Sequence, residues 1–255
     1  MLAEGNAPRN DRPAHRGAGV YFTEAGAAAP RSVVVDGRRL FRFMDTIYLD
    51  RPCEKLSPKK IQVLNAARRP LLERHEVAAV NHRVRSVLAR AIGVSQAGSV
   101  LEWGCGFHTM RDLFGEVKYS GLDIDPAVVQ FNRASAGESR FYLADQDLPD
   151  IPDGGFDAVV SAFVFHFRLS RLHIATMQRV LAPGGVLLAN VYRRTARSRR
   201  ELIAEFEQAG MRVLRAPDEA KLCADHEFWC VTHADSSGSE RAEAVRAAMR
   251  VSAPQ

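Results

Sequence analysis

The sequence SVLEWGCGFH, residues 99–108, places an apolar strand, an acidic residue and two glycines in immediate succession. Because glycine has no side chain, the turn through Gly104 and Gly106 lets the backbone between a strand and a helix approach a nucleotide-like ligand closely. A dinucleotide-binding loop has a third glycine at the position that Thr109 occupies here. Glu102, which precedes the first glycine closely, would repel a diphosphate and attract a cation. The stretch therefore favours a nucleotide-like ligand that carries positive charge and no phosphate.

Strands and helices alternate on both sides of this stretch, which is typical of an α/β fold with a parallel sheet. The predicted strands cover residues 100–103, 117–123, 140–144, 156–162 and 186–192, with a terminal pair at 211–214 and 227–232. The predicted helices cover residues 77–91, closed by Gly93, then 108–114, a helix from Pro126 with Asp125 as N-cap, 172–181, stopped by Pro183-Gly184-Gly185, and 199–209, closed by Gly210.

Acidic residues stand at the ends of the first three predicted strands of the alternating region, namely Glu102, Asp123 and Asp145. Ligands of open α/β sheets bind beyond the carboxyl ends of the strands. Asp123 follows Glu102 at about the interval of a ribose-binding acid, and a carboxylate can accept hydrogen bonds from both ribose hydroxyls. Each acid alone could be a helix cap or a turn residue, which is the better interpretation for Asp125 and Asp147. The three together, in register with the glycines, predict a ligand site.

These motifs resemble the class I S-adenosylmethionine-dependent methyltransferases, especially the small-molecule methyltransferases that open with E-x-G-C-G. The resemblance extends over about residues 77–233. It implies a three-layer, doubly wound, mostly parallel seven-stranded sheet with a C-terminal antiparallel strand. It also implies S-adenosyl-L-methionine as cofactor, which carries a sulfonium and an ammonium and no phosphate. The sequence departs from the family at His108, where a third glycine is usual.

The resemblance also assigns roles to residues that match the family's motifs. The residues expected to bind the cofactor are Glu102, Gly104, Cys105 and Gly106 in the loop, Asp123 at the ribose, Ile124 at the adenine face, Asp145 and Gln146 at the adenine edge, and Ser161 and Ala162 beside the methionine part. The residues expected to line the acceptor pocket are Phe163, Phe165, Phe167, Tyr192 and Arg193.

Histidine supplies the candidates for a general base, because imidazole titrates near neutrality. His166 is the first candidate, and its alternative role is that of a pocket wall without proton transfer. His108 is a second candidate, expected to be a loop residue near the cofactor. No role is assigned to His173, His226 and His233. The sequence shows no cluster at metal-ligand spacing, so no catalytic metal is expected.

Composition and segment boundaries complete the domain prediction. The 255 residues are 46% hydrophobic and 25% charged, an ordinary globular composition. Residues 1–31 are predicted to be a disordered arm, 32–76 a cap or lid, 77–233 the cofactor-binding domain and 234–255 a polar tail. No apolar run approaches the ~20 residues that cross a bilayer. The four cysteines form no C-x-x-C pair, which favours free thiols and a cytoplasmic location.

Net charge is +5, and part of the excess lies at the basic rim, residues 193–200. Such a rim could bind an acidic substrate or RNA, or it could be a solvated loop. The leading prediction is methyl transfer to a small-molecule acceptor with apolar bulk, which fits specialised metabolism. The alternatives are an RNA or protein methyltransferase that uses the rim, and a cofactor-binding protein without transferase activity. The sequence does not identify the acceptor, the atom methylated or the oligomeric state.

Overall fold

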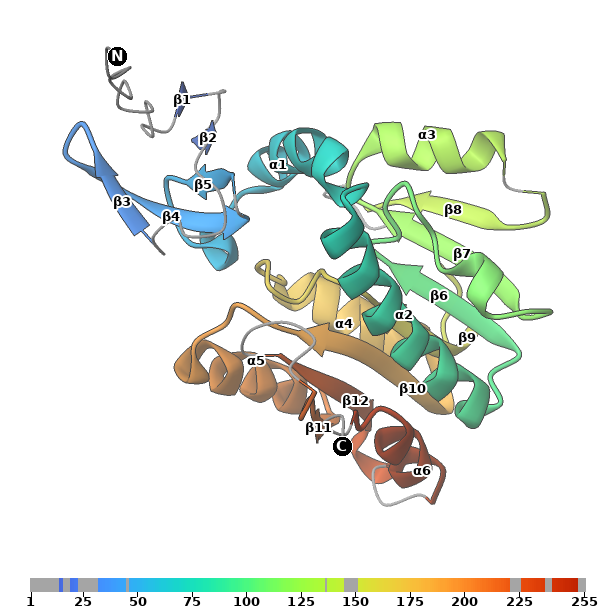
Figure 1. The fold of residues 1–255 in the computed structure, drawn as a ribbon. Helices are drawn as coiled ribbons and strands as arrows, with labels where there is room; N and C mark the ends of the chain where they lie inside the picture. Colours follow the sequence, from blue (N-terminus) through green and yellow to red (C-terminus); the bar gives the residue numbers. More distant parts are fainter. Residues whose placement is uncertain are drawn as a thin grey trace, which may run out of the picture. The chain divides into compact units, whose positions relative to one another are not determined.

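The computed structural model describes residues 14–15, 19–22, 32–44, 46–135, 137–144, 151–220, 226–236 and 240–251 of the chain. Two sequence-predicted cofactor residues, Asp145 and Gln146, lie outside these ranges. The chain divides into two compact units, residues 1–72 and 73–255, which are drawn in Figure 1.

The first unit contains a five-stranded antiparallel sheet with the order β1-β2-β5-β4-β3. Its elements are β1 (Ala14–His15), β2 (Val20–Phe22), β3 (Ser32–Val35), β4 (Arg38–Met44), β5 (Ile47–Leu49), the 3₁₀ helix η1 (Cys53–Lys55) and helix α1 (Pro58–Leu72). Asp36 and Gly37 form the turn between β3 and β4, both with positive φ. Strands β1 and β2 lie within residues 1–31, the segment predicted to be a disordered arm. Strand β2 pairs with both β1 and β5.

The second unit is built on a seven-stranded sheet with the order β11-β12-β10-β9-β6-β7-β8. Its strands are β6 (Ser99–Trp103), β7 (Lys118–Asp123), β8 (Arg140–Leu143), β9 (Phe156–Ser161), β10 (Leu181–Val191), β11 (Met211–Pro217) and β12 (Glu227–His233). Strands β8, β7, β6, β9 and β10 are parallel neighbours, and β12 is antiparallel to both β10 and β11. The predicted mostly parallel sheet with a C-terminal antiparallel strand is confirmed.

Helices cover both faces of this sheet and give the predicted three layers (Figure 1). They are α2 (His75–Ser95), α3 (Pro126–Ala134), α4 (Arg171–Val180), α5 (Ala196–Gln208) and α6 (Glu240–Ala248), with the 3₁₀ helices η2 (Arg111–Leu113) and η3 (Ala234–Ser236). One apolar core packs side chains of α4 and α5 on the sheet, and a second packs those of α2 and α6 on its other face. No helix within the described ranges is long and apolar enough to cross a bilayer.

Three local predictions are corrected by the structure. The predicted helix 108–114 is only the short 3₁₀ helix η2. Helix α2 continues past Gly93 to Ser95, because Gln96 adopts the left-handed conformation and donates its N–H to the Gly93 carbonyl. Pro183-Gly184-Gly185 does not separate helix from strand but lies within β10, at a register shift against β9.

Candidate functional site

Three neighbouring strands of the parallel sheet end in left-handed backbone turns at their carboxyl ends. Gly104 follows β6 with φ 77°, Phe163 follows β9 with φ 59°, and Arg193 follows β10 with φ 54°. This conformation is costly for residues other than glycine and is concentrated at functional sites. A Cβ on Gly104 would also lie 2.4 Å from Cγ2 of Val164, so the turn after β6 requires glycine. All three turns lie at the carboxyl edge of the sheet, where a ligand was predicted to bind.

Glu102, at the end of β6, is a buried carboxylate with one unsatisfied oxygen. Its Oε2 accepts hydrogen bonds from the N–H of Met110 at 2.8 Å and the hydroxyl of Tyr119 at 2.6 Å. Its Oε1 has no hydrogen-bond partner in the described part of the chain. Burial raises the pKa of Glu102 to about 7, against the opposing charge of Arg85. A cation placed beside Oε1 would favour the ionised form.

Asp123, at the end of β7, orders the glycine loop and the start of α3. Its Oδ2 accepts the N–H of Gly106 at 2.9 Å, and its Oδ1 accepts the N–H of Asp125 at 3.0 Å. Asp125 has the predicted, separate role of N-cap, since its side chain accepts the N–H of Ala127 at 3.0 Å. Asp123 therefore joins the glycine loop to the start of α3, whereas Asp125 only caps α3.

A residue that the sequence analysis missed, Asn132 of α3, also holds the glycine loop. Its Nδ2 donates to the Gly106 carbonyl at 2.8 Å. Cys105 is buried beneath the loop against Phe141, so its thiol packs in the core and only its backbone borders the ligand edge. A Cβ on Gly106 would meet no atom within 4 Å. The open side of the loop is therefore at Gly106.

The other predicted cofactor residues that the structure describes are Ser161, Ala162 and Ile124. The Ser161 hydroxyl, at the end of β9, donates to the Trp103 carbonyl at 3.0 Å and joins β9 to β6. Ala162 is buried in the core beneath α2, and Ile124 is partly buried against the core on the opposite face. The Ser161 side chain thus links the ends of β9 and β6 beside the loop.

The aromatic segment after β9 separates into core and edge residues. Phe165 has no exposed surface and stacks on Phe206 with ring centroids 5.8 Å apart. Phe165 therefore packs in the core in this structure, and its expected pocket position stays a prediction. Phe163 is partly exposed and meets the Tyr192 ring edge-on at 5.6 Å. His166 is buried, with its ring 3.9 Å from that of Phe167 and 4.6 Å from that of Tyr192.

The basic rim is largely engaged in contacts within the protein. Arg194 is buried and donates to the carbonyls of Phe165 and Phe167 and to the Ser198 hydroxyl. Arg197 pairs with Glu201 on the exposed face of α5. These contacts fix the end of β10 and the first turn of α5.

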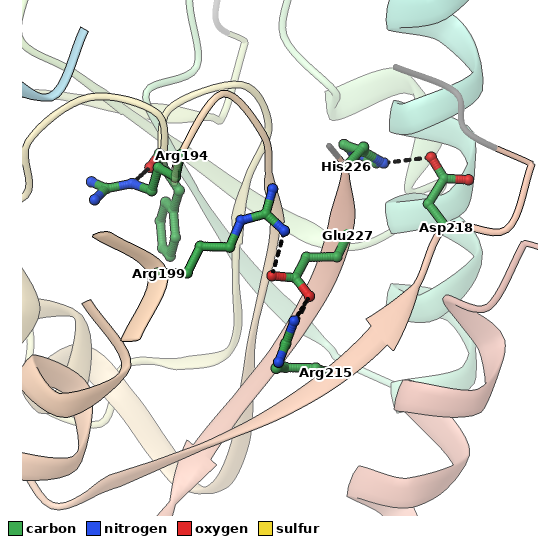
Figure 2. Close-up of polar contacts among 7 residues, drawn as sticks. Arg194, Arg199, Arg215, Asp218, His226 and Glu227 are labelled. Atoms are coloured by element: carbon green, nitrogen blue, oxygen red, sulfur yellow. Dashed lines mark hydrogen bonds and ion pairs between the residues drawn. The ribbon is translucent and has the colours of Figure 1, made fainter. Parts of the chain in front are cut away.

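A second set of charges continues from the rim to the start of β12. Arg199 lies 3.1 Å and Arg215 2.6 Å from the two oxygens of Glu227, and Figure 2 shows Glu227 held between them. Arg193, in contrast, is exposed, with its guanidinium 5.8 Å from the centroid of the Tyr192 ring.

Two further buried polar residues at this edge, Asn190 and His226, were not assigned roles from the sequence. Asn190 is the one polar residue of the apolar run VLLANV in β10, and this irregularity is the signal that could have drawn attention to it. His226 pairs with Asp218 at 2.7 Å, a contact formed only when β11 and β12 pair (Figure 2). The described residues contain no group of His, Cys, Asp and Glu that could hold a metal ion.

Comparison with known proteins places this site in a family context. Residues 101–189 match the model of a methyltransferase domain. No curated protein matches the chain. Among solved structures, the [4+2]-cyclase SpnF has a TM-score of 0.54 at 15% identity, covering 71% of this chain and 97% of its own. The CurJ carbon methyltransferase has a TM-score of 0.51 at 14% identity, covering 71% of this chain and 62% of its own. CalS10, an amino pentose methyltransferase from Micromonospora echinaspora, has a TM-score of 0.48 at 20% identity, with coverages of 68% and 97%.

Proposed function

We propose that this chain is a class I S-adenosylmethionine-dependent methyltransferase that transfers the methyl group of the cofactor to a small-molecule acceptor with apolar bulk. The observation that carries the proposal is the arrangement at the ends of β6 and β7. There the buried Glu102, the open loop at Gly106 and the Asp123 carboxylate occur together.

The chemistry of these residues fits the cofactor. Glu102 keeps one buried oxygen without a partner among the described residues, which suits a cationic group. The Asp123 oxygens accept the backbone N–H groups of Gly106 and Asp125, and a carboxylate is an acceptor that suits the hydroxyls of a ribose. The space in front of Gly106 allows a ligand to approach the backbone. Glu102 would therefore hold a positive group of the cofactor, and Asp123 its ribose.

When bound, the cofactor supplies a methyl group on a sulfonium, which leaves as a neutral thioether. The protein's contribution is then alignment of the acceptor and exclusion of water. Phe163 and Tyr192 offer partly exposed aromatic rings beyond the strands that flank the loop. These rings favour an acceptor with apolar bulk, and His166 adjoins them.

The contacts of the basic rim favour a small molecule over RNA. Arg194 donates to backbone carbonyls, and Arg197 and Arg199 pair with carboxylates. An RNA-binding surface combines available cations with exposed aromatic platforms. The expected cytoplasmic location is supported by the buried free thiols of Cys53, Cys105 and Cys230.

Calorimetry with S-adenosylmethionine and its demethylated product tests the cofactor site directly. We expect both compounds to bind at one site and to compete with each other. Absence of heat with either compound, together with binding of NADH, would contradict the proposal.

Incubation of the cofactor-loaded protein with a metabolite extract tests the acceptor class. We expect mass spectrometry to show one small compound that gains the mass of one methylene. Because one structural neighbour is named a [4+2]-cyclase, the fold does not by itself establish methyl transfer. Cofactor binding without any methylated product would favour the protein without transferase activity. Salt-dependent RNA binding with methylated RNA would favour the nucleic-acid alternative.

A further inference from the structure

Besides Glu102, two buried side chains at the carboxyl edge of the sheet each keep a polar atom without a hydrogen-bond partner among the described residues. These atoms are Nδ2 of Asn190 and Nε2 of His226. Buried polar atoms are paired in the great majority of cases, and an unpaired one calls for a ligand, a water or a catalytic role. The glycine loop and the aromatic residues after β9 do not explain either atom.

The pairing of β10 with β12 brings these two residues to the same face of the sheet. Asn190 is the direct partner of Phe228. Side chains alternate along a strand, so His226 lies on the same face as Phe228, and its ring is 4.6 Å from the Phe228 ring. His226 is therefore the diagonal neighbour of Asn190, a relation in which side chains are about 7–8 Å apart or less. The two polar side chains are therefore neighbours on one face of the sheet.

The orientation of Asn190 is fixed by the strand end next to it. Its Oδ1 accepts the N–H of Phe163 at 2.6 Å. Because an N–H donor requires the oxygen there, the amide nitrogen must point away from Phe163. Phe163 is the residue with positive φ after β9, so Asn190 also stabilises this left-handed turn. Its Nδ2 is thus a preoriented donor.

The orientation of His226 is fixed by Asp218 at the end of β11. The Nδ1 atom lies 2.7 Å from Asp218 Oδ2, a contact drawn as a dashed line in Figure 2. Neither side chain has exposed surface. A carboxylate at Nδ1 favours the tautomer with the proton on Nδ1 and the lone pair on Nε2. Burial lowers the pKa of His226, and the positive charge of Arg199 lowers it further. The negative charges of Asp218 and Glu227 raise this pKa but do not outweigh burial. The ring is therefore neutral, with Nε2 as a proton acceptor.

We propose that Asn190 and His226 form a polar pair that binds the hydroxyl group of the methyl acceptor, with His226 Nε2 taking its proton and Asn190 Nδ2 donating to its oxygen. Asp218 is the positioning residue of this pair. The proposal rests on the proposed methyl transfer. The hydroxyl oxygen forms the new bond to the methyl carbon, the carbon–sulfur bond breaks with its electrons on the neutral thioether, and the proton passes to Nε2. The imidazolium so formed remains beside the Asp218 carboxylate.

The experiment uses 4-nitrophenol as the hydroxyl probe, because its phenol and phenolate forms have different visible spectra. The full-length protein is saturated with the demethylated cofactor and titrated with 4-nitrophenol across pH. A proton acceptor and a donor at the bound oxygen both favour the phenolate. We expect the bound probe to ionise with an acid constant raised about tenfold, which corresponds to about 1.4 kcal/mol. Because the His226 ring is covered, the titration also tests whether a hydroxyl compound reaches it.

Two variants separate the members of the pair. His226→Gln should abolish the shift in ionisation and leave affinity for the demethylated cofactor within about twofold. Asn190→Asp keeps an oxygen for the Phe163 N–H but replaces the donor by a negative oxygen, so phenolate binding should fall roughly tenfold or more. Asp218→Asn should give a smaller shift than the wild type. His233→Gln is the matched control, since His233 contacts the Leu181 carbonyl at the start of β10 and should retain the full shift.

The outcomes distinguish this pair from the proposed function. Wild-type protein that binds the demethylated cofactor but leaves the 4-nitrophenol spectrum unchanged overturns the pair and leaves the methyltransferase assignment standing. A shift that persists in both His226→Gln and Asn190→Asp also overturns it. Absence of cofactor binding in the wild type overturns the proposed function instead. Thermal melting of each variant shows whether it is folded. If His226→Gln does not fold, the result for Asn190→Asp decides the test.

Discussion

At the scale of single residues, Asp123 and Asp125 separate cofactor binding from helix stability. Replacing Asp123 by Asn preserves its shape and an acceptor oxygen for the loop but removes the charge that the ribose hydroxyls would meet. We expect Asp123→Asn to weaken cofactor binding by roughly tenfold and Asp123→Ala by up to a hundredfold, since a charge-assisted hydrogen bond contributes about 1.5–3 kcal/mol. Calorimetric titration with S-adenosylmethionine measures both losses.

Asp125→Ala is the matched control for this pair. It removes the N-cap of α3 and should lower the free energy of unfolding by about 1 kcal/mol with little change in cofactor affinity. Denaturant unfolding measures the first quantity and calorimetry the second. The reverse pattern, in which Asp125→Ala loses the cofactor and Asp123→Ala loses only stability, would show that the assignment of the two acids is wrong.

Glu102 makes cofactor binding depend on pH. Its pKa is about 7 because it is buried, so part of the protein carries a protonated Glu102 at neutral pH. A cationic ligand requires the ionised form. We therefore expect the affinity for S-adenosylmethionine to rise with pH up to about 7 and to level off above it, with at most about a tenfold change per pH unit below the pKa. Calorimetry at a series of pH values measures this profile.

Glu102→Gln should remove that pH dependence and weaken binding throughout. The same substitution tests the effect on stability. Because the pKa of Glu102 is raised on folding, its contribution favours the folded state below the unfolded pKa and is lost as pH rises through about 7. The variant should therefore gain thermal stability relative to the wild type above pH 7 more than near pH 5. An equal effect at both pH values would contradict the assigned ionisation.

The residues of the loop were predictable because one contiguous motif carries them. Glu102, Asp123 and the cap Asp125 follow directly from strand ends and a helix start. Asn132, Asn190 and His226 were not predicted, because each acts through a partner that only the folded structure supplies: the Gly106 carbonyl, the Phe163 N–H and the Asp218 carboxylate. The core packing of Phe165 was likewise not predicted, since the sequence does not show on which side of the edge a ring packs.

At the scale of elements, we expect substitution by alanine at two glycines to change the free energy of unfolding in opposite directions. Gly93 lies inside α2, and a Cβ there would meet nothing within 4 Å, so Gly93→Ala should stabilise the protein by about 0.5–1 kcal/mol. Gly121 lies in β7, where a Cβ would be 2.7 Å from the Phe141 ring and 3.1 Å from the Cys105 sulfur. Gly121→Ala should destabilise it by about 1–3 kcal/mol. Denaturant unfolding measures both, and equal signs would contradict the packing described here.

Element types followed from hydrophobic periodicity, whereas several boundaries depended on tertiary contacts. The strands of the central sheet were predicted because buried parallel strands are continuous apolar runs. The segment 108–114 forms only a 3₁₀ turn, since the N–H of Met110 is bound by the Glu102 side chain across the site. The strand β10 includes Pro183-Gly184-Gly185 because Leu181 pairs with Phe156 before the register shifts. Such contacts leave no local signal.

At the scale of the whole molecule, the division at residues 72 and 73 predicts a stable cofactor-binding fragment. All described residues assigned to cofactor binding belong to the unit of residues 73–255. We expect limited proteolysis to cut near residue 72, and the larger fragment to bind the demethylated cofactor with an affinity within a few-fold of the intact chain. Mass spectrometry of the digest and calorimetry of the purified fragment test this. A fragment that is folded but does not bind would show that the first unit contributes to the cofactor site.

The contacts of the buried Arg194 hold one part of the site, the backbone of residues 165–167, in a way that does not depend on pH. A guanidinium stays charged at any pH at which the protein is folded. Its bonds to the carbonyls of Phe165 and Phe167 and to Ser198 therefore persist while Glu102 and His226 gain or lose protons. The backbone behind the aromatic residues keeps one shape across the working range. Acid should thus weaken occupancy and proton transfer at this edge without remodelling the contour that an acceptor meets.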